Sequence, residues 1–388
     1  MLRSQFDDLI GQILDQFPGL SDIICTVGKP VQAEVYGELL DTRLDPDPGR
    51  LVPWHVECMA NCLLSGNMRL YNDLTTRGSC DLSYELQGRA RFRVNVFQQK
   101  GSLALVMRQL PSSIPSLADL NLPDVFQDMA REKYGLILVT GGTGTGKSTS
   151  LAALVDAINA RSSKHILTLE DPVEFVHLHK QGVINQRELG IDFDSFASGL
   201  RAALRQAPKV ILVGEIRDKE TISIALEAAE TGHLVLGTLH TSDTAQAINR
   251  IIGMFELSEE RLIRGRLAES LKYIVSQRLM PKQDGGRVAA FEVLVNTIRI
   301  RELIVNGEDQ EKTFASVLQA GSTYKMIDFD QYLADLFDKE LISEEIAMLN
   351  GSDKASLAQM IDKIKAERGE KVTDIEGLEL DVDYDRKQ

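Results

Sequence analysis

The 388-residue sequence has no apolar run that approaches the roughly 18 residues of a membrane-spanning helix, so we expect no such helix. Basic residues are scarce: 43 lysines and arginines against 57 acids give a net charge of −14, which argues against a nucleic-acid partner. The N-terminal segment MLRSQFDDLIGQ is acidic and amphipathic, unlike a secretory signal. These features predict a globular cytoplasmic protein.

Cysteine is also rare, with four residues in the chain and none after Cys80. His55, Cys58 and Cys62 have helical spacing, so a metal site completed by Cys80 is one interpretation. A lone CxxxC lacks the paired spacing of a structural zinc site, and small buried thiols are the favoured interpretation. The HLH segment at 177–179 puts two imidazoles on one strand face without ligand partners, so we expect a solvated strand there.

The first part of the chain predicts a small α+β domain. The segment VQAEVYGEL alternates like one strand, and ARFRVNVFQQKGSLALVMRQLP predicts two strands joined at Lys100-Gly101. Three prolines in the segment PSSIPSLADLNLP then predict a linker.

The rest of the chain predicts an α/β core followed by helices. Apolar strand-like runs alternate with helical patterns, which is typical of a parallel sheet covered by helices on both faces. After Asn296 the pattern is helical, and the C-terminal residues are strongly acidic, which predicts disorder. The expected parts are an N-terminal domain (1–110), a linker (111–123), a core (124–295), a helical C-terminal subdomain (296–365) and an acidic tail (366–388).

A glycine-rich phosphate-binding loop follows the apolar run LILVT and opens a helical pattern. Its sequence GGTGTGKS satisfies G-x-x-x-x-G-K-[ST], in which backbone N–H groups converge on phosphate oxygens at a helix N-terminus. We expect Lys147 to bind the β- and γ-phosphates of ATP, and the Ser148 hydroxyl to bind Mg²⁺. The predicted nucleotide-binding residues are Gly141, Gly142, Thr143, Gly144, Thr145, Gly146, Lys147, Ser148 and Thr149.

Three further apolar runs carry polar residues at their ends. VILVGE ends in Glu215, which we expect to reach Mg²⁺ through a water, with Gly214 leaving room for the metal's water shell. HILTLEDP ends in Glu170, which we expect to polarise the attacking water. HLVLGTLHT carries His233 at its entry and His240, a sensor of the γ-phosphate, at its exit. A helix N-cap or surface charge is the alternative for the acids, and a satisfied core imidazole for the histidines.

Four segments in order, TGGTGTGKST, ILTLEDPVEF, VILVGEIRD and ETGHLVLGTLHT, resemble the Walker A, Asp box, Walker B and His box of the secretion ATPases. From about residue 22 to 366 the chain is most similar to the PilT/PilU family of type IV pilus retraction ATPases, within the type II/IV secretion ATPase superfamily. The resemblance implies a RecA-like P-loop NTPase core with an N-terminal PAS-like domain. It also implies a homohexameric ring, in which each PAS-like domain sits over the next subunit's core.

The resemblance also implies roles for individual residues. Glu170 resembles the catalytic base and Glu215 the metal-binding acid of the Walker B strand, where the family uses Gly-Glu. Arg93 in ARFRVN and Arg108 in VMRQL match arginines that reach the phosphates from the N-terminal domain, and such arginines stabilise charge on a transferring phosphoryl group. Exposed cross-strand charges on a hairpin are the alternative for both arginines.

The chain departs from the family pattern in two places. Ala207, Pro208 and Lys209 stand where the family commonly has Asp-Pro-Asp, and RIRELIVN (residues 299–306) stands where the retraction motors carry A-I-R-N-L-I-R-E. Assembly motors and their type II secretion relatives carry paired CxxC motifs after the Walker B strand. Because no cysteine follows Cys80, that branch is disfavoured.

The family implies an ATP- and Mg²⁺-dependent motor for pilus retraction, pilin depolymerisation and twitching motility. It would be cytoplasmic and peripheral at the inner-membrane face, with the inner-membrane platform protein and, through it, the pilins as partners. The changed C-terminal signature favours, as an alternative, a PilU-like accessory subunit that assists a paralogous retraction ATPase and whose own hydrolysis is dispensable. A RecA-like nucleic-acid motor fits the phosphate loop but not the net charge of −14.

Overall fold

The computed structural model describes residues 1–370. These residues form two compact units. The first comprises Met1–Tyr134, Ser148–Ile216 and Ser223–Leu236, and the second comprises Gly135–Lys147, Arg217–Ile222 and the chain from Gly237 onward. Most of the predicted acidic tail falls on residues 371–388, outside the described residues.

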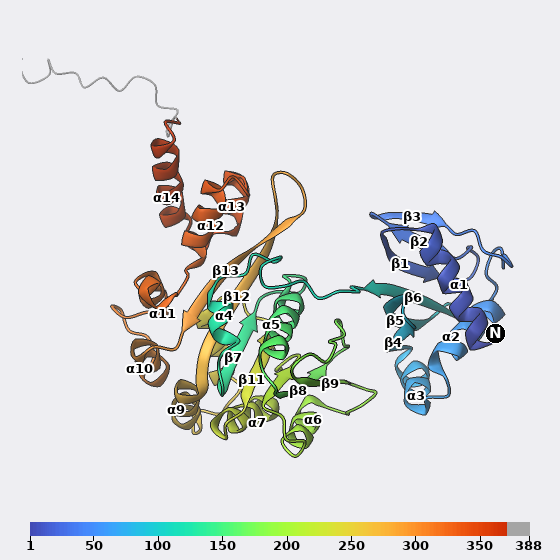
Figure 1. The fold of residues 1–388 in the computed structure, drawn as a ribbon, viewed down its shortest axis with the longest axis horizontal. Coiled ribbons are helices and arrows are strands. Elements are labelled where there is room, and N and C mark those ends of the chain that lie inside the picture. Colours follow the sequence, from blue (N-terminus) through green and yellow to red (C-terminus); the bar gives the residue numbers. More distant parts are fainter. Residues whose placement is uncertain (371–388) are drawn as a thin grey trace, which may run out of the picture. The chain divides into compact units, whose positions relative to one another are not determined.

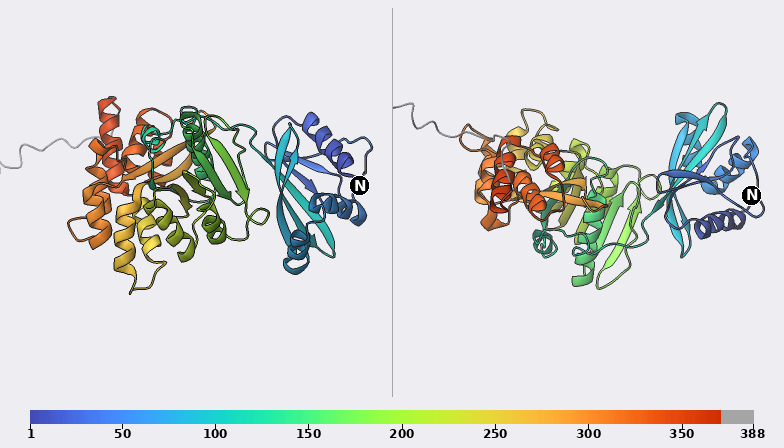
Figure 2. Two further views of the ribbon diagram at one scale, coloured as in Figure 1. Left: turned by 60° about the horizontal axis from the view of Figure 1, so that its bottom comes forward. Right: turned by 90° about the horizontal axis from the view of Figure 1, so that it is seen from above.

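The N-terminal residues form a six-stranded sheet with the order β3-β2-β1-β6-β5-β4 (Figure 1). Helices α1 and α2 lie against one face of this sheet (Figure 2), and α3 packs beside β4. The aromatic rings of Phe6, Tyr84 and Phe92 are fully buried in the core between them. The elements are α1 (Arg3–Gln16), β1 (Leu20–Cys25), β2 (Gln32–Val35), β3 (Glu38–Asp41), α2 (Pro53–Leu64), α3 (Met68–Arg77), β4 (Ser79–Leu86), β5 (Ala90–Gln99) and β6 (Ser102–Leu110).

Two hairpins in this sheet turn through pairs of residues with positive φ. Lys100 (47°) and Gly101 (74°) join β5 to β6, which confirms the predicted hairpin. Tyr36 (52°) and Gly37 (86°) join β2 to β3, so the prediction of a single strand over VQAEVYGEL was wrong. Tight hairpin turns of this kind usually carry asparagine or aspartate before glycine, and the tyrosine conceals the turn in the sequence.

The second sheet has seven strands in the order β13-β12-β7-β11-β10-β8-β9. Neighbours β12 and β7, β10 and β8, and β8 and β9 run parallel, whereas β12 and β13 are antiparallel. The four predicted runs are confirmed as β7, β8, β10 and β11, but β9, β12 and β13 were not anticipated. The bounds are β7 (Gly135–Thr140), β8 (His165–Glu170), β9 (Val183–Glu188), β10 (Val210–Val213), β11 (Leu234–Leu239), β12 (Leu271–Pro281) and β13 (Arg287–Val295).

Helices alternate with these strands and continue to the end of the described chain. Their arrangement confirms the predicted α/β class and the helical character of the C-terminal part. Among residues 1–370, no helix combines the length and apolarity needed to cross a bilayer. The helices are α4 (Val125–Met129), α5 (Lys147–Arg161), α6 (Phe196–Ala203), α7 (Lys219–Glu230), α8 (Thr244–Ile252), α9 (Glu260–Ser270), α10 (Ile298–Asn306), α11 (Phe314–Gln319), η1 (Ser322–Tyr324), α12 (Phe329–Asp338), α13 (Glu344–Asn350) and α14 (Lys354–Glu367).

The segment at 177–179 differs from its prediction, because it forms no strand. His177 is buried, and this burial lowers the pKa of its imidazole to about 4, so the ring is neutral near neutral pH. The Nδ1 atom of His179 accepts a hydrogen bond from the N–H of Ile184. The cysteines are free thiols, and the part of the chain that the structure describes holds no cluster of three or more metal-ligating side chains.

Candidate active site

The phosphate loop connects β7 to α5. Gly144 and Gly146 have φ angles of +79° and +90°, a backbone conformation that side chains with a Cβ rarely adopt. Lys147 begins α5, and its buried side chain folds back under the loop. Its Nζ atom donates hydrogen bonds to the carbonyl oxygens of Gly141 (2.8 Å) and Gly142 (2.7 Å). The loop therefore places a positive charge at its own centre, next to the first N–H groups of a helix.

Glu170 is the last residue of β8, and two neutral donors hold its carboxylate. The Thr168 hydroxyl and the Gln186 amide both donate to Oε1, at 2.6 and 3.1 Å. Burial raises the pKa of this carboxyl to about 7, and the two hydrogen bonds oppose that rise without cancelling it. A carboxylate with a pKa near neutrality, fixed at a strand end, is suited to accept a proton.

Neither Thr168 nor Gln186 was identified from the sequence as a functional residue. Both lie on strands, and they are direct partners in the parallel register between β8 and β9. Both polar atoms of the Gln186 amide are hydrogen-bonded, because its Nε2 also donates to the carbonyl of Phe175 and its Oε1 accepts from the N–H of His177. The one sequence signal was a run of polar residues, NQRE, within a strand whose register could not be known.

Glu215 lies two residues beyond the end of β10, the strand next to β8. Val213 and Leu169 are register partners, so Glu170, which ends β8, and Glu215, which follows β10, lie at the carboxyl ends of two neighbouring parallel strands. The N–H of Gly214 donates to the carbonyl of Leu169 at 2.7 Å. A Cβ atom on Gly214 would lie 3.0 Å from that oxygen and 3.3 Å from the Cα of Glu170. Close approach to β8 is the reason the structure gives for this glycine, and room for a metal's water shell stays a prediction.

The two histidines of the His box lie at opposite ends of β11. His233 precedes the strand, and its Nδ1 lies 3.0 Å from the carbonyl oxygen of Ala228 near the end of α7. His240 follows the strand and is exposed. A strand of six residues spans about 20 Å, so the two imidazoles cannot serve one small site. His240 is the one at the carboxyl end of its strand, as Glu170 and Glu215 are at the carboxyl ends of theirs.

Arg93 on β5 and Arg108 on β6 are direct partners across the antiparallel register. Their side chains are 47% and 70% exposed. The Nε of Arg108 donates to the buried carboxylate of Asp22 at 2.9 Å, while Arg93 and Asp81 make a looser ion pair at 3.8 Å. Each arginine thus has an acid on an adjacent strand, Asp22 on β1 for Arg108 and Asp81 on β4 for Arg93, and these ion pairs offset the repulsion between the two opposed arginines.

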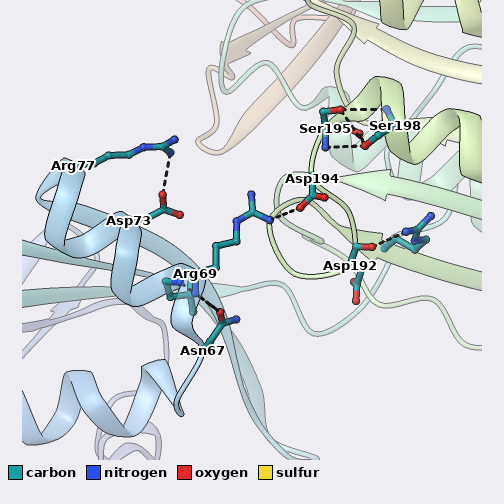
Figure 3. A network of polar contacts seen from close by, with 10 residues as sticks. Asn67, Arg69, Asp73, Arg77, Asp192, Asp194, Ser195 and Ser198 are labelled. Carbon is teal, nitrogen blue, oxygen red and sulfur yellow. Dashed lines mark hydrogen bonds and ion pairs between the residues drawn. The ribbon is translucent and has the colours of Figure 1, made fainter.

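The loop before α6 carries a further polar network (Figure 3). The Nη1 atom of Arg69 lies 3.2 Å from Oδ1 of Asp194, but both side chains are largely exposed, so this ion pair contributes little to stability. Ser195 caps α6, since its Oγ accepts the N–H of Ser198. The start of α6 is therefore held by its own cap.

A phosphate loop between β7 and α5, together with acids that end neighbouring parallel strands, defines a P-loop NTPase with a RecA-like sheet. Residues 78–328 match the family model described as "Type II/IV secretion system protein". The PilT retraction ATPase of Pseudomonas aeruginosa is 41% identical over 88% of this chain and 96% of its own length. PilU of the same organism is 37% identical over 92% of this chain and 91% of its own.

Among solved structures, a crystal structure of the pilus retraction motor PilT with bound ADP is similar to this chain with a TM-score of 0.80. It is 41% identical, and the match covers 92% of this chain and 98% of that one. The chain therefore belongs to the PilT/PilU family of the type II/IV secretion ATPase superfamily. The predicted family and fold class are confirmed, whereas the roles of the individual site residues and the domain limits stay predictions.

Proposed function

We propose that this chain is the ATP-hydrolysing motor of type IV pilus retraction. It would work as a homohexamer at the cytoplasmic face of the inner membrane. There it would act through the platform protein on the pilins and return them to the membrane. Family membership supports this function, and so does the observation that carries it: two acids, Glu170 and Glu215, lie at the carboxyl ends of neighbouring parallel strands in a chain that also has a complete phosphate loop.

In this proposal the loop residues 141–149 bind the phosphates of ATP and Lys147 neutralises their charge. Glu170 accepts a proton from the water whose oxygen attacks the γ-phosphorus, and ADP is the leaving group. Its pKa near 7 allows the carboxylate to be ionised before the attack and to hold the proton after it. His240 senses the γ-phosphate. We assign His233, which contacts the end of α7, only an indirect role through the position of β11.

The site also has donors that suit Mg²⁺. The Ser148 hydroxyl and the Glu215 carboxylate are hard oxygen ligands, the type that this ion prefers. Glu215 would act through a water. Bound Mg²⁺ would supply positive charge at the β- and γ-phosphate oxygens, as it does in other P-loop NTPases.

Arg93 and Arg108 would complete the site of a neighbouring subunit. The two adjacent guanidinium groups each lie beside an acid of a neighbouring strand, but both arginine side chains are exposed enough to meet another chain, and guanidinium groups suit phosphate oxygens. We predict that Arg93→Ala chains and Lys147→Ala chains, each inactive alone, recover part of the ATPase activity when they are mixed. In mixed rings some interfaces pair an intact loop with an intact arginine.

Steady-state ATP hydrolysis measured across mixing ratios tests this prediction. We expect ATPase activity to be highest when the two variants are mixed in about equal amounts. In the control mixtures, Arg77→Ala, which removes an exposed arginine of α3, takes the place of Arg93→Ala. Mixtures that stay inactive at every ratio would mean that Arg93 serves the site of its own chain.

An accessory role, in which the chain assists a paralogous motor, is the second candidate, and one observation favours it. In the signature helix α10, the retained Ile300, Leu303 and Ile304 are buried. The four positions that depart from the signature, Arg299, Glu302, Val305 and Asn306, are all exposed. Packing therefore explains most of what is retained, and the surface that a partner would meet has changed.

Deletion of the gene separates the two functions. For a primary motor we expect pili to accumulate on the cell surface while twitching is lost. The wild-type gene should restore twitching, and a Lys147→Ala gene should not. If twitching persists in the deletion strain and disappears only when a paralogue is also removed, the accessory function is correct.

A further inference from the structure

Gln277 on β12 lies directly against the phosphate loop. Its side chain is only 4% exposed, unusually buried for a polar residue. The amide Nε2 donates a hydrogen bond to the carbonyl oxygen of Thr145 at 2.7 Å. Gln277 therefore contacts the loop two residues before Lys147, at the point where the loop turns into α5.

The glycines at both ends of the loop are fitted to the same residue. A Cβ atom on Gly141 would lie 2.5 Å from the backbone oxygen of Gln277. A Cβ atom on Gly146 would lie 2.8 Å from its Nε2. The contact at Gly141 is with backbone and cannot be relieved by a side-chain movement, and the φ angles of Gly141 (+146°) and Gly146 (+90°) are ones that residues with a Cβ rarely adopt, so glycine fits both positions.

The strand that carries Gln277 is held on both sides. β12 pairs in parallel with β7, where the hydroxyls of Ser276 and Thr140 lie 2.7 Å apart, and it pairs with β13 on its other edge. Arg278, the next residue, faces the opposite side of the sheet, where its guanidinium stacks on the ring of Phe329 at 3.8 Å. Gln277 thus acts from a rigid support rather than from a mobile loop.

We propose that Gln277 is a positioning residue that sets the shape of the phosphate loop for nucleotide binding. In a trans peptide the C=O and the following N–H point in opposite directions. By holding the Thr145 carbonyl toward β12, Gln277 turns the N–H of Gly146 away from β12, into the concave side of the loop that binds phosphate. This inference rests on the nucleotide binding assigned under the proposed function.

The role requires an amide donor rather than a side chain of the right size. Methionine fills a similar volume but cannot donate to Thr145, whose part-buried carbonyl would lose a partner. Glutamate has nearly the same shape, but it sets a carboxylate oxygen against a carbonyl oxygen and brings negative charge toward the phosphates. The inference therefore ranks the variants: the wild type binds ATP best, Gln277→Met less well and Gln277→Glu least well.

The test compares ATP binding and steady-state hydrolysis in the full-length chain. We expect Gln277→Met to raise both the Kd and the KM for ATP by up to about tenfold, the effect of one part-buried hydrogen bond, with kcat at saturating ATP almost unchanged. Gln277→Glu should raise them further. Gln283→Met, the same substitution at an exposed position beyond the end of β12, should change neither.

Thermal unfolding of each variant shows whether the fold is retained. If Gln277→Met and Gln277→Glu both bind ATP as tightly as the wild type, the inference is overturned. A lower kcat with an unchanged KM would also overturn it, because that result indicates a loss of folded protein rather than of loop shape. A wild-type chain that binds no ATP would instead contradict the proposed function, so the two failures are distinguishable.

Discussion

Replacement of Lys147 by alanine is expected to abolish ATP binding. The substitution removes the charge that the loop places at its centre, where Nζ is held by the carbonyls of Gly141 and Gly142. A charge-assisted contact with phosphate is among the strongest polar interactions in proteins, so we expect the affinity to fall by about 100-fold or more. Isothermal titration with ATP and with ADP measures the loss for each nucleotide.

Two controls make this result specific. Lys339→Ala removes an exposed lysine that follows α12 and should leave the affinity unchanged. Thermal unfolding of Lys147→Ala should still show a single folded state, at a somewhat lower temperature than the wild type, because the substitution removes two hydrogen bonds to the loop carbonyls but retains the helix start and the loop glycines. If Lys147→Ala bound ATP within about threefold of the wild type, the loop would not be the phosphate site.

The parts of the core that could be predicted were those where a strand is wholly apolar. β7 and β10 are buried at every residue, and each is followed directly by a chemically distinct motif. A continuous apolar run bounded by glycines or charges has few interpretations other than a buried strand. The strand order could not be read in this way, because it depends on contacts between segments far apart in the sequence.

β12 and β13 were missed for a physical reason that bears on the site. The apolar run of β12 is broken by Ser276, Gln277 and Arg278, which resemble a loop in the sequence. In the fold these polar side chains contact Thr140, Thr145 and Phe329, so they interact with other parts of the protein and not with solvent alone. Their partners lie far away in the sequence, and no local pattern indicates them.

The positions of Glu170 and Glu215 at the carboxyl ends of strands could be predicted because each follows an apolar run, but the surroundings of these acids could not. The contact between Gln186 and Glu170 depends on the register of β8 against β9. Similarly, the left-handed conformation of Ala207 (φ 52°) was not evident. It lies where the family commonly has aspartate, a residue that tolerates this conformation better than alanine does.

The pKa of Glu170 predicts how the wild-type ATPase responds to pH. Only the ionised carboxylate can accept a proton, and burial raises its pKa from the usual acidic range to about 7. The ionised fraction therefore grows as pH rises through 7, and turnover at saturating ATP should fall as the pH is lowered below that value. A base with an ordinary carboxyl pKa would show no such fall until the pH was far more acidic.

Replacement of Glu170 by glutamine should leave ATP binding intact and stop turnover. An amide oxygen in the place of Oε1 can still accept the hydrogen bonds from Thr168 and Gln186, so the geometry is retained while the base is lost. We expect kcat to fall by about 10²–10⁴ with an affinity for ATP close to that of the wild type. Single-turnover hydrolysis and nucleotide titration measure the two quantities separately.

Glu174→Gln is the matched control for this substitution. Glu174 lies four residues further along the chain, and its negative charge helps to raise the pKa of Glu170, but it makes no hydrogen bond to that carboxylate. Its amide variant should hydrolyse ATP at nearly the wild-type rate, with the pH profile moved slightly toward acid because one neighbouring charge is gone. Normal turnover by Glu170→Gln would instead show that another group takes the proton, and the carboxylate at the end of β8 would then be a structural acid.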